Sequence, residues 1–511
     1  MILELWHSKQ HICLRSSVFY AQRPHNEKGG FMAYDIYNIH MGKARCALDL
    51  GDGSERASYV NQDYILDVLK RPHRCVNLMY TYYPLDKEWP NRISEACADM
   101  DVKFAWDYPY DDYFPYGENN EPFGQMKDIR RHGQDVMLTL TIDIKTPKED
   151  LIRIARELKP FGRMRLRINH ECNGNWFTHN KRYTYKEVGD FFAEFAEIIK
   201  KEAPNIKTIF CAGLKEADEA FVPYEEEFAS AYRACDVYSC DKYLALHWGW
   251  PYDIAEIGSD SFEAQDLEHI YKVFNETAAH LDELFGAKEF ILGEFNADGD
   301  VTGPYLQAEA VRRFYDRIEA DDNCLINAVS MYQFRDKGRL GLEIENPSNP
   351  AVGIRQPLLD TYREIMEREC FKPQIARTDD EKVIFPADLR WGGSEDADGI
   401  EIMVHFDKTP VFFEVVYDEN ISLMTECGGR WFYKAEGVSR VDMMSLFFDG
   451  QNGGPGIAIP DGGADIPLRI FTTPKDGVNS CKNDDECVNY YDTLMNEPEF
   501  RIRYEPCGAV K

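Results

Sequence analysis

The sequence carries little positive charge and has no long apolar run. Lysine and arginine together number 58 against 89 aspartates and glutamates, so the formal net charge is −31. A surface of that sign repels phosphate backbones, so we expect no nucleic-acid partner, and a neutral polymer is easier to accommodate than an anionic one. No stretch of 18 apolar residues occurs, so we expect no membrane span.

The first 22 residues also lack the basic start and continuous apolar core of a secretory signal. A cytoplasmic protein is therefore the default expectation. A secreted or cell-surface location stays open if a leader has been trimmed.

Several short motifs that would indicate a cofactor, a metal or another nucleophile are absent. There is no CxxC pair for a zinc ribbon, no GxGxxG after the first expected strand, no P-loop and no GxSxG elbow. Gly174 stands where an HExxH zinc-protease motif beginning at His170 would need its second histidine. Two acidic segments, 296–300 and 395–399, lack the complete calcium-loop pattern and are interpreted as turns. We therefore expect neither a metal nor a cofactor.

The overall composition is typical of a globular protein. Hydrophobic residues make up 44% of the 511 residues and charged residues 29%, and this length favours two domains. The 14 cysteines are scattered through apolar or mixed segments, which favours free thiols, although Cys481 and Cys487 could form a local disulfide. Aromatic residues reach 13%; most should pack in the core, while some could stack on sugar rings.

The first 360 or so residues alternate short apolar runs with amphipathic helical patterns. The expected strands are 75–83, 102–108, 135–142, 164–170, 206–213, 237–243, 289–295 and 326–334. Strands that alternate with helices predict a parallel sheet, and eight such units predict a closed (β/α)₈ TIM barrel. An open doubly wound sheet would alternate in the same way, but the missing GxGxxG gives a dinucleotide fold no support.

Helical patterns fade after about residue 370, and short β-rich runs separated by Gly, Pro, Asp and Asn take over. These runs are 399–406, 411–417, 430–436, 443–448, 468–473 and 500–505. Their spacing predicts a smaller C-terminal β-sandwich-like domain. We expect a barrel over 1–365, a linker over 366–385 and a β-rich accessory domain over 386–511. That domain could bind carbohydrate or simply brace the barrel.

Two glutamates end expected barrel strands. Glu171 closes the fourth strand and Glu294 lies at the end of the seventh. In such barrels the catalytic side chains come from the C-terminal ends of the strands. Hydrolysis of a glycosidic bond with retention needs two carboxyl groups about 5–5.5 Å apart, one as acid/base and one as nucleophile. Either glutamate alone could be a strand-end carboxylate in a salt bridge, but the pair in this strand order favours glycoside hydrolysis.

The segment RLRINHECNGNWF (165–177) resembles the acid/base motif of glycoside hydrolase family 26, a retaining clan A family of barrel hydrolases. The matching positions are Arg167, His170, Glu171, Asn173, Gly174, Trp176 and Phe177, with Cys172 in place of the usual Met. Residues 235–243 resemble the sixth-strand pattern of that family, and residues 288–295 resemble its nucleophile segment. The similarity spans roughly residues 70–335.

The resemblance implies that Glu171 is the acid/base and Glu294 the nucleophile. It also implies roles for His170 and Tyr243 beside these carboxylates and for Trp176 at the sugar. This sequence departs from the family where His179 replaces a second Trp, and where the eighth strand offers Tyr332, Gln333 and Phe334 instead of a Trp. The floor of the subsite is therefore altered, so β-mannan, β-glucan, β-xylan and related glycans all stay open as substrates.

Further substrate-binding candidates lie in the segments that follow expected strands. Tyr110 lies in the aromatic segment 106–123, and His247 and Trp248 follow the sixth strand. Arg167 could bond the nucleophile or brace a loop, with ion pairing at the barrel floor as the alternative. Our first hypothesis is an endo-acting retaining hydrolase of β-linked polysaccharide. A non-catalytic sugar-binding barrel and an exo-acting glycosidase on oligosaccharides are the alternatives.

Overall fold

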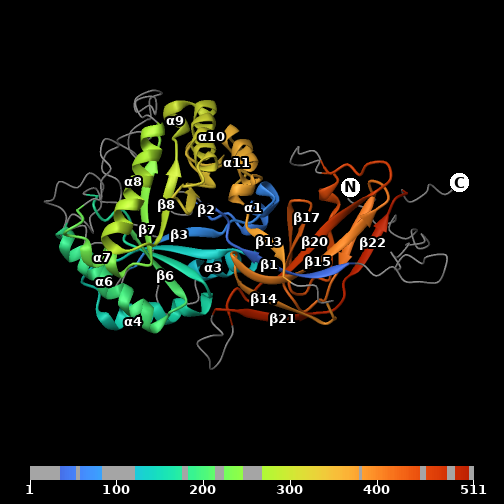
Figure 1. The fold of residues 1–511 in the computed structure, drawn as a ribbon, viewed down its shortest axis with the longest axis horizontal. Helices are drawn as coiled ribbons and strands as arrows, with labels where there is room; N and C mark the ends of the chain where they lie inside the picture. The colour runs from blue at the N-terminus through green and yellow to red at the C-terminus, as the bar shows by residue number, and fades with distance from the viewer. Residues whose placement is uncertain are drawn as a thin grey trace, which may run out of the picture.

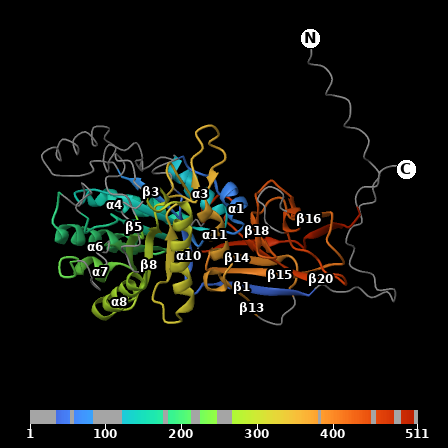
Figure 2. The ribbon, with the colours of Figure 1, turned by 90° about the horizontal axis from the view of Figure 1, so that it is seen from above.

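The computed structural model describes residues 35–52, 58–82, 121–174, 182–212, 224–245, 267–378, 383–448, 456–479 and 489–505. These residues form a barrel and a β-rich part that lie side by side in both ribbon views (Figures 1 and 2). None of the helices within the described ranges combines the length and the apolar character that crossing a membrane requires.

Eight parallel strands close into a barrel, with the last strand pairing back onto the first. The strands are β2 (Ala47–Gly51), β3 (Cys75–Thr81), β4 (Asp135–Thr141), β5 (Met164–Ile168), β6 (Ile206–Cys211), β7 (Val237–Tyr243), β8 (Glu289–Asn296) and β9 (Ala328–Met331). The predicted (β/α)₈ barrel is thus confirmed, although its first strand is β2, which the sequence reading missed. The expected strand 102–108 lies outside the described residues.

Helices separate consecutive strands and cover the outside of the barrel (Figure 1). They are α1 (Gln62–Leu69), α3 (Glu121–Arg131), α4 (Lys148–Leu158), α6 (Tyr185–Glu202), α7 (Ala229–Ala234), α8 (Leu267–Phe285), α9 (Gly299–Thr302), α10 (Pro304–Ala320) and α11 (Pro357–Met366). Helix α6 shows why such segments are helical. Thr184 and Glu187 form a capping box at its start, and Phe192 and Phe195 recur at helical spacing on its buried face.

The interior of the barrel changes from apolar to polar along the strands. Near the N-terminal ends it is filled by Ala47, Cys75, Met137, Ile209, Val237, Ile291 and Ala328. Side chains two residues apart on a strand lie on the same face. The positions two residues after this apolar layer include Asn77, Thr139, Ser239 and Ser330, all of them buried. The apolar layer therefore supplies a packed floor, with the ion pairs of Arg74, Arg165 and Glu289 at the same end of the barrel, and a second polar layer lies toward the C-terminal ends.

The β-rich part contains two antiparallel sheets. The larger sheet contains β1 (Ile36–Gly42), β13 (Gln374–Arg377), β14 (Ala387–Gly393), β15 (Asp396–Phe406), β17 (Leu423–Cys427), β18 (Arg430–Lys434), β20 (Ala464–Thr472) and β21 (Tyr491–Met495). The smaller one contains β16 (Phe412–Val416), β19 (Arg440–Asp442) and β22 (Glu499–Arg503). The sheets share one core, in which the Phe406 and Phe413 ring centroids lie 5.1 Å apart.

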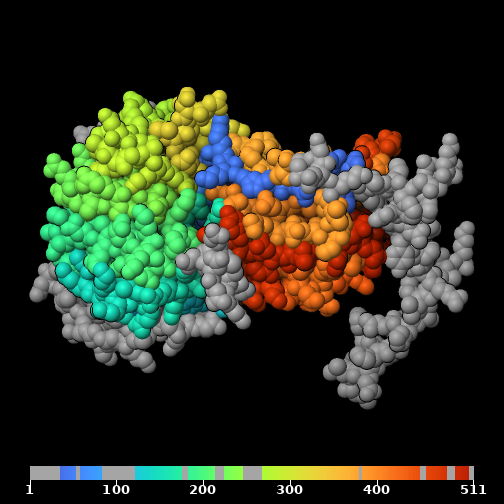
Figure 3. Space-filling view, turned by 60° about the horizontal axis from the view of Figure 1, so that its bottom comes forward, coloured from blue at the N-terminus to red at the C-terminus, as the bar shows by residue number. Residues whose placement is uncertain are grey.

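Three segments differ from the sequence expectation. Strand β1 lies within the range assigned to the barrel (1–365) and β13 within the expected linker (366–385), yet both belong to the larger sheet. Ile36 pairs with Ile402, and Figure 3 shows the blue segment that contains β1 lying against the orange C-terminal part. Residues 443–448 were expected as a strand but contain the 3₁₀ turn Met444–Leu446, because Asp442 Oδ1 accepts from the Met444 N–H and turns the chain.

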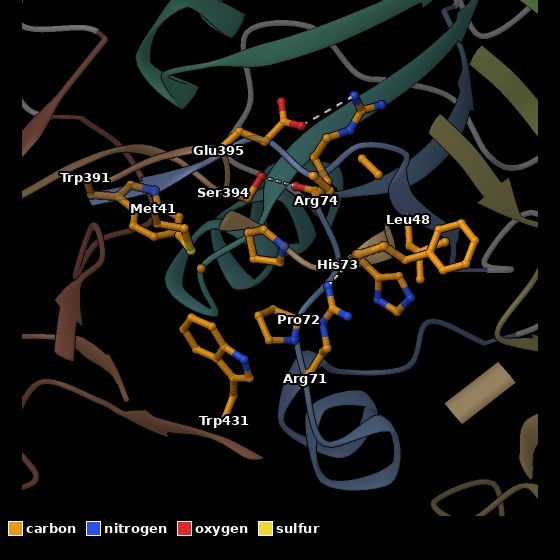
Figure 4. A pocket seen from close by; sticks show the side chains of 15 residues that line it. Met41, Leu48, Arg71, Pro72, His73, Arg74, Trp391, Ser394, Glu395 and Trp431 are labelled. Carbon is orange, nitrogen blue, oxygen red and sulfur yellow. Dashed lines mark hydrogen bonds and ion pairs between the residues drawn. The ribbon is translucent and has the colours of Figure 1, made fainter. Parts of the chain in front are cut away.

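The larger sheet packs against the N-terminal ends of the barrel strands. Ser394 Oγ donates to the Arg74 carbonyl at 2.8 Å, and Glu395 lies 3.5 Å from the Arg165 guanidinium. Figure 4 shows Ser394 and Glu395 meeting Arg74 between the two parts, with Trp391 and Trp431 facing the same interface. A small cavity of about 30 Å³ lies at this interface. The larger sheet therefore does not cover the opposite end of the barrel, where the C-terminal ends of the strands meet.

Candidate active site

The carboxylate of Glu294 is held by two donors from other strands. Tyr243 Oη donates to Glu294 Oε2 at 2.7 Å, and Arg167 Nη2 donates to Oε1 at 2.5 Å. The Glu294 side chain is only 7% exposed. Burial, followed by the charge of Glu294, raises the pKa of Tyr243 well above its usual value, so the phenol keeps its proton and stays a donor. This carboxylate is therefore fixed in orientation by charge-assisted hydrogen bonds.

Arg167 joins Glu294 to a second buried carboxylate, Asp241. Its Nη1 donates to both oxygens of Asp241 at 2.9 and 3.1 Å, and its Nε donates to Thr139 Oγ1 at 2.8 Å. Burial alone would lower the pKa of Arg167, but Asp241 and Glu294 raise it above its usual value. Burial raises the pKa of Asp241 to about 7, with Arg167 opposing this shift and Glu294 adding to it. Two carboxylates thus compete for one guanidinium, which leaves one negative charge in excess when both are ionised.

Sequence reasoning missed Asp241. The residue lies two positions before Tyr243 on the same strand, so the two side chains share one face. That spacing was the available signal, because a carboxylate buried inside a barrel needs a cation and Arg167 points to the same interior. The structure therefore adds Asp241 to the site as the partner that holds Arg167.

A bulge in β8 turns Glu294 into the barrel. The pairing of β8 with β9 shifts between Leu292 and Phe295, so regular alternation is broken there. Gly293 and Glu294 both approach Arg167 as a result, while Phe295 stacks on Phe314 of α10 outside the barrel. A Cβ on Gly293 would lie 2.6 Å from Arg167 Nη1 and 2.7 Å from Asp241 Oδ1. Glycine is required at this position because the ion pair passes directly over the backbone.

Glu171 follows β5 in a sharp turn. Its φ is 49° and that of Asn169 is 51°, both in the left-handed region that few side chains adopt. The Gly174 N–H donates to the Glu171 carbonyl at 2.7 Å and closes the turn. Glu171 is partly exposed, and it lies four residues after Arg167, a span of at most roughly 14 Å. Since Arg167 reaches Glu294, the ends of β5 and β8 border the same mouth of the barrel.

The sequence candidates fall into three groups: side chains that contact one another, residues that directly follow β5, and residues outside the described ranges. Arg167, Tyr243 and Glu294 contact one another directly, and the Tyr332 ring meets the Tyr243 ring edge-on at 5.8 Å between centroids. His170 is buried immediately before Glu171. Outside the described residues lie Tyr110, Trp176, His247 and Trp248. Within the described ranges, no three or more His, Cys, Asp or Glu side chains are grouped in a way that could hold a metal ion.

Tyr243→Phe removes one of the two donors to Glu294 without changing the shape of the ring. A hydrogen bond to a charged group contributes about 1.5–3 kcal/mol, so we expect kcat/KM for a glycoside substrate to fall roughly 10- to 150-fold. Tyr238→Phe is the matched control, because Tyr238 lies on the same strand but donates to the Gly286 carbonyl at 2.8 Å on the outer side. Equal losses in both variants would contradict a specific role for Tyr243.

No protein-family model and no curated protein matches this sequence. Among solved structures, the catalytic domain of a family 26 endo-β-1,4-mannanase from Bacillus sp. JAMB-750 aligns with a TM-score of 0.44 at 14% identity, over 64% of this chain and 87% of that one. A family 51 α-L-arabinofuranosidase from Bifidobacterium longum gives 0.42 at 13% identity, over 86% and 100%. A family 39 glycoside hydrolase from Bacteroides cellulosilyticus WH2 gives 0.41 at 10% identity, over 84% and 81%. All three TM-scores are below 0.5, so these likenesses carry no argument about function, which rests on the site.

Proposed function

We propose that this protein is a retaining glycoside hydrolase that cuts a β-linked polysaccharide, with Glu294 as nucleophile and Glu171 as acid/base. The observation that carries the proposal is the pair of donors on Glu294. Tyr243 and Arg167 come from two other strands and aim a buried carboxylate. Glu171 follows the strand that supplies Arg167. Two carboxyl groups at the C-terminal ends of the fourth and seventh strands are the groups that double displacement needs.

In the first step the Glu294 carboxylate attacks the anomeric carbon, and Glu171 gives its proton to the leaving oxygen. This forms a glycosyl ester on Glu294 and releases the part of the chain beyond the cut. In the second step Glu171 takes a proton from water as the water oxygen attacks the anomeric carbon, which breaks the ester bond and frees Glu294 as a carboxylate. Arg167 and Tyr243 hold Glu294 in line for both displacements.

The charge of the site suits this chemistry. Positive charge develops on the sugar ring in the transition state, and the cluster of Asp241, Glu294 and Arg167 carries one excess negative charge when both carboxylates are ionised. A barrel that merely bound sugar would have no need to fix a buried carboxylate with two donors. This favours an enzyme over the non-catalytic alternative.

For substrate, we propose a neutral β-glycan of the β-mannan, β-glucan or β-xylan type, cut internally. The family 26 resemblance and the net charge of −31 support this class. Tyr332, whose ring contacts that of Tyr243, stands where the family has a Trp, so the choice among these sugars stays open. Tyr110, Trp176, His247 and Trp248 stay predicted sugar contacts.

For the β-rich part, we propose a bracing role. Three of its aromatic residues, Trp391, Trp431 and Phe471, share a buried cluster with Leu66 of α1, whereas a sugar-binding platform would present such rings to solvent. The backbone N–H of Trp431 also donates to the carbonyl of Lys70, the residue after α1, at 2.8 Å. These contacts tie the larger sheet to the barrel.

The test is a screen of the full-length protein against β-mannan, mixed-linkage β-glucan and β-1,3-xylan, with an anionic β-glycan for contrast. We expect new reducing ends and a ladder of oligosaccharides from at least one neutral polymer and none from the Glu294→Ala variant. Release of a single small product would replace endo action by exo action. A wild-type protein that binds these polymers without cutting any would favour the sugar-binding barrel.

A further inference from the structure

The Asn169 side chain, two residues before Glu171, hydrogen-bonds to the backbone directly after β4 in the way a neighbouring strand would. The last backbone rung between β4 and β5 runs from the Asn169 N–H to the Leu140 carbonyl at 3.2 Å. Beyond it, Asn169 Oδ1 accepts from the Ile142 N–H at 2.8 Å and Asn169 Nδ2 donates to the Ile142 carbonyl at 2.9 Å. One carboxamide thus satisfies both polar groups of a single backbone residue, as a neighbouring strand would.

Asp143, the residue after Ile142, binds the chain a second time, at Arg182 and Tyr183. Asp143 is buried, with 2% of the residue exposed, and it accepts from Tyr183 Oη at 3.1 Å and from Arg182. Residues 182 and 183 follow the segment that starts at Asn169. Two consecutive residues directly after β4, Ile142 and Asp143, therefore fix both the approach to Glu171 and the chain at residues 182–183.

Two further hydrogen bonds hold the backbone directly after Glu171. The Cys172 N–H donates to the Cys211 carbonyl at 3.0 Å, and Tyr185 Oη donates to the Asn173 carbonyl at 3.0 Å. Asn169 itself has a φ of 51°, a conformation that asparagine tolerates better than most residues. Position 169 therefore needs a side chain that tolerates this backbone, is short, and carries one donor and one acceptor.

From these contacts we infer that Asn169 is a positioning residue for the acid/base: its carboxamide, clamped on Ile142, sets the place from which Glu171 reaches the leaving oxygen. The inference rests on the proposed function, because it assumes that Glu171 is the acid/base. Asn169 touches no substrate in this account and acts through the backbone of the turn. Displacing a catalytic group by about 1 Å costs on the order of 10²-fold in rate.

The test uses Asn169→Asp, which keeps the shape but replaces the donor to the Ile142 carbonyl with an acceptor. The readout is kcat/KM for a series of aryl β-glycosides whose leaving groups range from phenol to 2,4-dinitrophenol. A displaced acid slows substrates that need protonation and spares those that do not. We expect roughly a 10- to 100-fold fall for phenyl glycosides and less than about a threefold fall for 2,4-dinitrophenyl glycosides.

Asn205→Asp is the matched control. Asn205 is also buried, and its Nδ2 donates to the Lys159 and Gly162 carbonyls at 2.9 and 2.6 Å, but it precedes β6 at the floor of the barrel. We expect this variant to lose stability without any change in leaving-group dependence. Asn169→Ser, whose hydroxyl can still replace one of the two bonds, serves if Asn169→Asp does not fold, and should show the same selectivity with a smaller loss.

Glu171→Gln, measured in parallel, separates the two ways of failing. Steeper leaving-group dependence in both Glu171→Gln and the Asn169 variant supports the inference. Steeper dependence in Glu171→Gln with equal losses on all substrates in the Asn169 variant overturns the positioning role and leaves the proposed function standing. Unchanged dependence in Glu171→Gln overturns both.

Discussion

Glu294→Ala is expected to lower the hydrolysis of every glycoside substrate by roughly 10⁴-fold or more, the scale observed when a catalytic nucleophile is removed. The loss has a direct cause: without the carboxylate that Tyr243 and Arg167 aim, nothing attacks the anomeric carbon. Removing the carboxylate also leaves a space at the position from which attack occurs. Azide, a small anionic nucleophile, should enter that space and restore turnover of 2,4-dinitrophenyl β-glycosides. The product should be the α-glycosyl azide, because only one displacement then takes place.

The control for this experiment lies on the same strand. Glu289, at the floor end of β8, forms ion pairs with Arg74 and Arg165 and is distant from the proposed chemistry. Glu289→Ala should lower the thermal midpoint of unfolding because it removes one of the carboxylates that neutralise the buried guanidinium groups of Arg74 and Arg165, leaving Asp49 and Glu395 as their remaining partners. Its activity should not respond to azide. An active Glu294→Ala variant, or azide rescue that gives a β-glycosyl azide, would contradict the assignment of the nucleophile.

Glu171→Gln is expected to separate substrates by their leaving groups. General acid catalysis contributes roughly 10²–10⁴-fold, so cleavage of polysaccharide or of phenyl glycosides should fall by that factor. The first step on 2,4-dinitrophenyl glycosides should be nearly unaffected, because that phenolate leaves without a proton. The second step still needs Glu171 as a base, so the glycosyl-enzyme should accumulate and a burst of dinitrophenolate should precede slow turnover.

Glu294→Ala is the comparison for that result. It should lose activity on both kinds of substrate alike, whereas Glu171→Gln should not. If Glu171→Gln lost activity equally on phenyl and dinitrophenyl glycosides, Glu171 would not be the acid/base. Stability measured for both variants shows whether either loss comes from unfolding.

The barrel was accessible from the sequence because its strands and helices have different hydrophobic periods. Strand β2 escaped that reading since ALDLG is only five residues long and includes Asp49, which pairs with Arg74 at 2.6 Å. The pairing of β1 with β15 joins Ile36 to Ile402. Local patterns do not report a contact between residues so far apart in the chain, so the contribution of β1 to the C-terminal sheet was out of reach.

The site was accessible in part for a similar reason. Glu294 and Tyr243 end strands and lie within motif-like segments, so their positions could be inferred from the order of the elements. The role of Arg167 was left open among bonding the nucleophile, bracing a loop and ion pairing at the barrel floor, because its side chain has to cross the barrel to reach Glu294. The Asn169 clamp involves a carboxamide imitating a strand, and no periodic pattern reports such a bond. The bulge that turns Glu294 inward depends on Gly293 and on the ion pair above it, a contact between three strands that no local sequence pattern reports.

Trapping the covalent intermediate tests the central claim most directly. The Glu171→Gln enzyme is mixed with the 2,4-dinitrophenyl β-glycoside of the sugar selected by the polysaccharide screen, quenched in acid during the burst, digested with pepsin and analysed by mass spectrometry. The account predicts that the peptide containing Glu294 gains the mass of one glycosyl residue in proportion to the burst. A burst with no sugar on that peptide, or with the sugar attached to another residue, would contradict it.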